Sequence, residues 1–208
     1  MFQKYATLKI AAWVDSSTRK TASTDVKVGS FSIGADRRDG MLYVATRACT
    51  ADVPNLNMDM WPREELMEAA NHYAGCPIYW NHDNLDTKKA RGVVIDAVFH
   101  DENPNDRWLE CLMEVDEQRA PKLCTLIRSG EIDTVSVGYN VSHCACNVCG
   151  NVAQTAAQYC DHIAMHKGQW FYGKQAFEIC YGIDPFELSL VDMPADQQAV
   201  IQMIASRS

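Results

Sequence analysis

The sequence predicts a mainly β (α+β) protein, an antiparallel β-barrel with flanking helices and one small insertion. Two observations favour this fold class. Many short segments alternate apolar and polar residues with the period of a half-buried strand, whereas only two segments have the pattern of a helix. Numerous short strands with few helices are typical of barrels and sandwiches. The chain has 208 residues, which suits one domain over residues 1–208.

Alternating positions locate the strands. In residues 109–115 the odd positions are apolar, and Glu110 and Glu114 lie on the opposite face. Residues 93–99 repeat this pattern, and residues 101–106, rich in Asn and Asp, predict a turn between these two strands. The Ser- and Thr-rich residues 16–25 predict a mobile loop. Further strands are predicted at Leu8–Val14, Val26–Ser32, Leu42–Thr46, Pro77–Asn81, Val135–Val141 and Phe186–Asp192.

Two helices are predicted from their end signals. Pro62 suits the first position of a helix that runs to about residue 74, where Gly75 is a natural stop. Two glutamates lie in its first turn, where the helix dipole favours acidic side chains. The second helix runs from Pro121 to about residue 129 and ends at Gly130.

Composition and charge restrict the class of protein. The formal net charge is -8, which argues against broad electrostatic binding to nucleic acid. No apolar stretch reaches the length of about 18 residues that a transmembrane helix needs. Residues 1–14 lack the basic and then apolar layout of a signal peptide, so we expect cytoplasmic folding. Four scattered cysteines are interpreted as small buried thiols, namely Cys49, Cys76, Cys111 and Cys124.

Four other cysteines lie close together in the chain. A Cys-x-x-Cys turn can supply two thiolates, Cys146 and Cys149, and Cys160 and His162 can supply the other two ligands of a tetrahedral zinc ion. The sequence therefore predicts a zinc-binding insertion, a zinc knuckle, at residues 143–173. Four protein ligands leave no open position, so this zinc ion is expected to be structural and to supply the folding energy of a segment too short to build a core.

The sequence alone does not decide which residue is the fourth ligand of this cluster. Three further residues compete for its place, namely Cys144, His143 and His166.

Three polar residues on or beside predicted strands could form a catalytic group. His82 ends the apolar strand at 77–81 and has a near-neutral pKa, which suits a general base. Ser136 shares a strand face with Gly138, which leaves room for a close approach. Glu187 lies on an apolar strand, where pairing with a histidine would offset the cost of burying a carboxylate. Each also has an ordinary interpretation, as a loop histidine, a packed strand serine and a solvent-facing glutamate.

Three blocks of the sequence are informative because of the order in which they occur. The first is Pro77-Ile-Tyr-Trp-Asn-His-Asp83, followed by Gly92-Val-Val-Ile-Asp96. The second is Ser129-Gly-Glu-Ile-Asp-Thr-Val-Ser-Val-Gly-Tyr139, and the third is Phe186-Glu-Leu-Ser-Leu-Val-Asp-Met-Pro-Ala-Asp196, followed by Ala199. Together they resemble the prohead protease family of tailed phages, which is distantly related in fold to the herpesvirus assembly proteases. The cysteine-rich segment is similar to the zinc knuckle in versions from larger phages.

This resemblance implies a serine endopeptidase of capsid maturation. His82 matches the family's histidine, Ser136 its nucleophile and Glu187 its acidic third member, with Asp192 and Asp184 as fallbacks. The implied substrates are viral capsid, scaffold and core proteins, cleaved inside the procapsid in the host cytoplasm. Self-cleavage is implied as well and could remove the tail at 200–208. We expect a homo-oligomer or an activity that depends on assembly.

Two other functions are kept as alternatives. One is a non-catalytic procapsid core or scaffold protein that retains the protease fold. The other is a zinc-dependent nucleic-acid-binding module. The net charge of -8 disfavours it, and so does the scarcity of cationic residues near the knuckle, which are only Lys167 and Lys174. A metalloprotease is disfavoured because the sequence has no His-Glu-x-x-His stretch.

Overall fold

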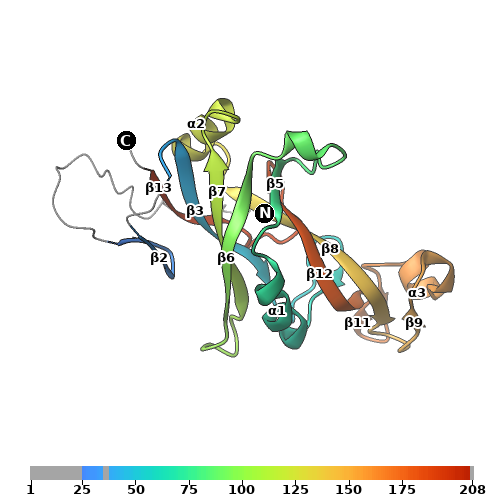
Figure 1. Ribbon diagram of the computed structural model, residues 1–208. Helices are drawn as coiled ribbons and strands as arrows, with labels where there is room; N and C mark the ends of the chain where they lie inside the picture. Colours follow the sequence, from blue (N-terminus) through green and yellow to red (C-terminus); the bar gives the residue numbers. More distant parts are fainter. Residues whose placement is uncertain (1–24, 35–37, 207–208) are drawn as a thin grey trace, which may run out of the picture.

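The computed structural model describes residues 25–34 and 38–206 (Figure 1). The strand predicted at 8–14 and nearly all of the loop predicted at 16–25 lie outside these residues. The protein is mainly β, with 44% strand and 16% helix, as the sequence predicts. No helix in the described part of the chain combines the length and the apolar character that crossing a membrane requires.

One large sheet holds most of the strands, in the order β13-β3-β7-β6-β5-β12-β8-β9, with β4 paired to β12. The sheet is mixed, because β12 runs parallel to β5 and β4 and antiparallel to β8. Its strands are β3 (Met41–Thr50), β4 (Asp59–Met60), β5 (Pro77–Trp80), β6 (Gly92–His100), β7 (Trp108–Asp116), β8 (Thr134–Cys146), β9 (Val152–Ala153), β12 (Glu178–Val191) and β13 (Ile201–Ser206).

The sheet is thus mixed rather than antiparallel throughout, and no ladder closes a barrel among the described residues, so the predicted antiparallel β-barrel is not confirmed. An isolated bridge between Thr134 and Val200 links β8 to the start of β13. Two backbone hydrogen bonds flank it, from Val135 N to Ala199 O at 3.0 Å and from Ile201 N to Asp133 O at 2.7 Å. Local alternation in the sequence cannot reveal that β5 and β12 run in parallel, because more than 90 residues separate them.

Two helices pack at opposite ends of the central strands (Figure 1). The helix α2 (Pro121–Ser129) begins at Pro121 and is capped by Gly130 at φ 73°, as predicted. The helix α1 (Arg63–Ala69) is shorter than predicted, because it tightens into a 3-10 turn, η1 (Ala70–His72). Pro62 is the residue before α1 rather than its first position.

The core lies between the sheet and the two helices. Leu66 of α1 and Leu123 of α2 belong to one cluster of buried side chains that includes Met113 and Leu188 of the sheet. At about 25 cal/mol per Å², burial of such side chains is the main stabilising contribution. The four scattered thiols are all buried, which confirms their predicted role. A separate small cluster packs the hairpin of β1 (Val26–Val28) and β2 (Phe31–Ile33) against the sheet.

Most of the segment between β8 and β12 projects from one end of the sheet (Figure 1). It contains β9, η3 (Ala156–Gln158), α3 (Asp161–Ala164) and the pair β10 (Trp170–Phe171) and β11 (Lys174–Gln175). The predicted start of the insertion at His143 lies inside β8, which pairs with β12 as far as Cys146. The insertion in the structure is therefore residues 147–177. A short 3-10 turn, η2 (Thr87–Lys89), lies between β5 and β6.

The predicted removable tail is part of the sheet. β13 pairs with β3 from Ile201 to Ser206, and Ile204 and Ala205 are buried. Removing residues 200–208 would therefore expose the apolar side chains beneath this strand.

Candidate active site and metal cluster

His82 lies in a tight turn directly after β5. Asn81 and His82 have φ values of 50° and 56°, a left-handed conformation in which Asn and His are enriched among non-glycine residues. Asn81 fixes the turn to the end of β12, because its Nδ2 donates to Asp192 Oδ2 at 3.0 Å and its backbone N–H donates to Leu190 O at 2.8 Å. This anchoring determines where the His82 ring lies.

Glu187 is the partner of His82. His82 Nδ1 lies 2.5 Å from Glu187 Oε1, and the hydroxyl of Ser189 donates to Glu187 Oε2 at 2.6 Å. Glu187 is 1% exposed and Ser189 is fully buried, so both carboxylate oxygens are satisfied inside the protein. An ionised carboxylate only accepts hydrogen bonds, so Nδ1 carries the hydrogen and the second ring nitrogen, Nε2, is left as an acceptor.

The electrostatics of this pair act on His82. The hydrogen bond with Glu187 raises the pKa of His82, burial works against this, and the charge of Glu187 adds to the rise. The side chain of His82 is 43% exposed, so its ring remains accessible from solvent. A half-exposed imidazole held by a buried carboxylate can accept a proton on its free nitrogen and be stabilised as a cation.

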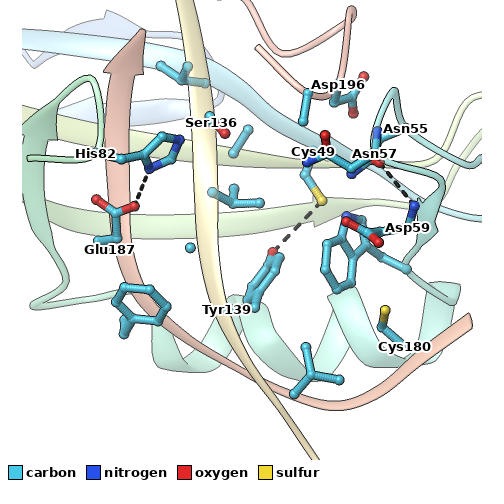
Figure 2. A pocket seen from close by; sticks show the side chains of 18 of the residues that line it. Cys49, Asn55, Asn57, Asp59, His82, Ser136, Tyr139, Cys180, Glu187 and Asp196 are labelled. Carbon is cyan, nitrogen blue, oxygen red and sulfur yellow. Dashed lines mark hydrogen bonds and ion pairs between the residues drawn. The ribbon is translucent and has the colours of Figure 1, made fainter. Parts of the chain in front are cut away.

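Ser136 lies on the neighbouring strand and faces the same cavity. It is the cross-strand partner of Ser189, and Gly138 is the partner of Glu187. In Figure 2 the His82 ring lies between Glu187 and Ser136, with its second nitrogen on the side toward β8. No hydrogen bond joins His82 to Ser136 in the part of the chain that the structure describes. The fold thus brings the three predicted residues together, with the contact between histidine and serine unformed.

Gly138 is required for this arrangement. A Cβ atom at this position would lie 2.6 Å from Glu187 Cγ and 2.8 Å from Phe186 Cζ, closer than real Cβ contacts allow. The two side chains reach Gly138 because a register shift between Pro185 and Glu187 forms a β-bulge in β12. The close approach predicted at Gly138 is therefore made by the side chains of Glu187 and Phe186.

The cavity that holds these residues has a volume of about 580 Å³ and continues well past Ser136. Its floor is aromatic, where Trp61 packs edge-on against Tyr139 at 4.8 Å between ring centroids. Tyr73 donates from its hydroxyl to that of Tyr139 at 2.6 Å. The far end of the cavity is polar and includes Asp59 and Glu178. A cleft of this size can hold several residues of an extended peptide.

The fallback acids have other partners. Asp192 pairs with Asn81, and Asp184 lies 3.6 Å from Nδ1 of His72. Glu187 is therefore the carboxylate that contacts His82.

The predicted metal ligands come together at the base of the insertion. One ligand atom from each of Cys146, Cys149, Cys160 and His162 lies within 4.8 Å of all the others. The Sγ atoms of Cys149 and Cys160 are 3.5 Å apart, close to the roughly 3.8 Å expected between two thiolates on one tetrahedral zinc ion with Zn–S bonds of about 2.3 Å. This Cys3His cluster could hold a metal ion such as zinc.

Local structure favours the thiolate form of Cys149 in this cluster. Gly150, at φ 73°, turns the chain so that its N–H donates to Cys146 O at 2.8 Å. The backbone N–H of Asn151 and a hydrogen bond with His162 lower the pKa of Cys149 to about 7. A thiol with this pKa loses its proton to a metal ion at neutral pH at little cost.

The three competing ligands have other contacts. Cys144 faces Cys180, with the two Sγ atoms 3.5 Å apart. His143 stacks on Tyr181, with ring centroids 5.1 Å apart. His166 lies beside Phe171, and its buried Nδ1 has no hydrogen-bond partner among the described residues.

Comparison of the chain with models of protein families, with curated proteins and with solved structures found no match.

Sequence reasoning missed two features of the site. Asn81 positions the turn that carries His82. The sequence could have indicated this role, because an Asn at the end of a predicted strand is typical of a turn. Cys180, the ninth cysteine, belongs to neither group of thiols distinguished in the sequence, because only its cross-strand register places it opposite Cys144.

Proposed function

We propose that this protein is a serine endopeptidase in which Ser136 is the nucleophile, His82 the general base and Glu187 the acid that orients the base. The observation that carries the proposal is the 2.5 Å contact between His82 Nδ1 and the buried Glu187, within the cavity that Ser136 also lines. A buried carboxylate that fixes one histidine nitrogen and leaves the other facing a serine is the arrangement of a catalytic triad.

In the proposed mechanism, His82 Nε2 accepts the proton of the Ser136 hydroxyl as the oxygen attacks a scissile carbonyl. The imidazolium then donates this proton to the leaving amine, and water hydrolyses the acyl-enzyme by the reverse sequence. Glu187 holds the tautomer and stabilises the cation, and Ser189 holds Glu187. The contact between His82 and Ser136 is proposed to form when a substrate binds, because catalytic hydrogen bonds often tighten in the complex.

The substrate class is proposed from the three sequence blocks that resemble prohead proteases. We propose capsid, scaffold and core proteins as substrates, cleaved during maturation inside the procapsid in the host cytoplasm. The Cys3His cluster is proposed to bind zinc with a structural role, because it offers four protein ligands and no open position. Self-cleavage at the proposed tail would remove β13 from the sheet.

The direct test is acylation of Ser136 by a serine-reactive fluorophosphonate, located by mass spectrometry. Wild type should be labelled at Ser136, and Ser136→Ala should carry no label. Ser142→Ala is the matched control, because Ser142 is exposed on the same strand outside the cavity and its loss should leave labelling unchanged. Co-expression with capsid and scaffold proteins should give processed products with wild type and none with Ser136→Ala.

The second candidate is a non-catalytic procapsid component with the protease fold. The absence of a hydrogen bond between His82 and Ser136 favours it, and it predicts no label at Ser136 even in assembled particles. The nucleic-acid-binding alternative loses support, because Lys167 is paired with the carboxylates of Asp59 and Glu178. Of the two cationic residues near the knuckle, only Lys174 is exposed.

A further inference from the structure

A second group of potential metal ligands lies at the end of the cavity away from Ser136. One ligand atom from each of Cys144, Glu178 and Cys180 lies within 4.8 Å of the other two, and all three residues are buried. The strand register explains this grouping, because Cys180 is paired with Cys144 and Glu178 with Cys146. Residues two apart on a strand share a face, so all these side chains face the same side of the β8–β12 pair.

The two thiols have a spacing suited to a shared ion. Their Sγ atoms are 3.5 Å apart, whereas a disulfide requires about 2.05 Å. Two thiolates on one tetrahedral zinc ion are separated by about 3.8 Å, given Zn–S bonds of about 2.3 Å.

Glu178 provides an independent observation. Its side chain is 9% exposed, and Oε1 accepts a hydrogen bond from Lys167. The buried Oε2 has no partner of good hydrogen-bond geometry among the described residues, although the Cys144 thiol and the Tyr159 hydroxyl lie near the carboxylate. A buried carboxylate oxygen without a donor is costly. A cation between this oxygen and the two thiols would remove that cost.

We propose that Cys144, Glu178 and Cys180 form a second metal site, distinct from the knuckle, that binds a thiophilic divalent ion of the zinc class. Binding transfers no electrons: each thiol releases its proton to solvent as its sulfur bonds to the ion. Two thiolates with Glu178 and the nearby Asp59 would carry four negative charges against the one positive charge of Lys167, and the divalent ion offsets most of this excess.

The three ligands also line the cavity that holds His82 and Ser136. Zinc prefers four ligands, so a ligand from the cavity would complete this site. The ion would thus be accessible from the cleft, unlike an ion enclosed by the four ligands of the knuckle.

The test is a count of metal ions in the full chain, stripped by chelation under reducing conditions and then titrated with Co²⁺ or Zn²⁺. Wild type should bind two equivalents by native mass spectrometry. Cys144→Ala and Cys180→Ala should each bind one and keep the cobalt–thiolate absorbance of the knuckle. Cys124→Ala, which removes a buried thiol far from both groups, should still bind two. Glu178→Gln should weaken the second equivalent at least about tenfold, since even outer-shell changes cost that much.

Several results would overturn this inference. Wild type that binds one equivalent refutes the second site without any variant, which keeps the test decisive if a variant fails to fold. Retention of two equivalents by Cys180→Ala refutes the assignment of its ligands. A Cys144–Cys180 disulfide in the reduced preparation would show that the thiols pair with each other. None of these results bears on labelling of Ser136, so the proposed peptidase activity is judged separately.

Discussion

Glu187 Oε1 lies 2.5 Å from His82 Nδ1, although the two residues are 105 positions apart in the chain. The parallel pairing of β5 with β12 produces this contact, because it places the turn after Trp80 beside the end of β12. Ser189 completes the arrangement from the same strand as Glu187. The geometry of this pair leads to the first three predictions.

The rate at which fluorophosphonate labels Ser136 should depend on the protonation of His82. Glu187 raises the pKa of His82, and only the neutral imidazole acts as a base, so the rate should rise with pH through a midpoint above 6.5. Glu187→Gln should move this midpoint down and lower the plateau by roughly 100-fold. Asp184→Asn is the control and should change neither, because Asp184 contacts His72. An unchanged midpoint in Glu187→Gln would contradict the pairing.

The same pair makes stability depend on pH. The folded-state pKa of His82 is raised, so its stabilising contribution is fully present below the unfolded pKa of about 6.5 and is lost as the pH rises through the folded value. Urea unfolding at several pH values should show this loss in wild type and a flatter profile in Glu187→Gln.

Ser189→Ala should destabilise the protein and slow labelling of Ser136. The substitution removes the donor to Glu187 Oε2 at a fully buried position, which costs about 1–3 kcal/mol. Urea unfolding measures the loss, with the exposed Ser142→Ala as control. Equal stability of Ser189→Ala and wild type would mean that this hydrogen bond does not hold the carboxylate.

Gly138→Ala should displace Glu187. The added methyl group would lie 2.6 Å from Glu187 Cγ, and overpacking of this kind costs about 1–3 kcal/mol. We expect both reduced stability and reduced labelling. Gly34→Ala is the matched control, because its Cβ would lie 3.7 Å from the nearest atom, an ordinary contact. Full labelling of Gly138→Ala would show that Glu187 is not needed in its present position.

Removal of metal should unfold the insertion and leave the sheet intact. The insertion, residues 147–177, has short elements and few buried apolar side chains among the described residues, so we expect the proposed metal–ligand bonds to hold it. Hydrogen exchange after chelation should rise sharply in these residues and stay slow in β3 and β7. Cys149→Ser should behave like the chelated protein, whereas Cys124→Ala should remain protected until chelated. Protection that survives chelation would show that the knuckle folds without metal.

Truncation after Val200 should lower stability. It removes Ile204, which is 3% exposed, and burial of such a side chain contributes about 1.5–3 kcal/mol. Thermal unfolding of the truncated chain should show a lower Tm than wild type, while Gln202→Ala on the same strand should change it little. An unchanged Tm would mean that the strand is dispensable and can serve as a removable tail.

The sequence predicts local structure well and the pairing of distant strands poorly. The ends of α2 were predictable because Pro121 and Gly130 act within one turn of the helix. The direction of β12 relative to β5 was not predictable, because alternation gives the face of a side chain but not its neighbouring strand. For the same reason, the cross-strand pairing of Cys144 with Cys180 could not be predicted.

Prediction of the candidate site followed the same division. His82, Ser136 and Glu187 could be named because they lie in three sequence blocks that together resemble a known family, although each residue alone also has an ordinary interpretation. Asn81 and the β-bulge at Phe186, which determine their geometry, depend on contacts between distant strands.

The pairing of β8 with β12 extends from Cys146 opposite Glu178 to Thr134 opposite Val191. Because side chains alternate along a strand, a slip of one residue would turn a whole strand face away from its present surroundings. A register shift between Pro185 and Glu187 divides this pairing into two parts, one that sets Ser136 opposite Ser189 and one that sets Cys144 opposite Cys180. A slip of one part alone would therefore disturb one group of side chains and spare the other, so labelling of Ser136 and metal binding by the two thiols report on different halves of the same strand pair.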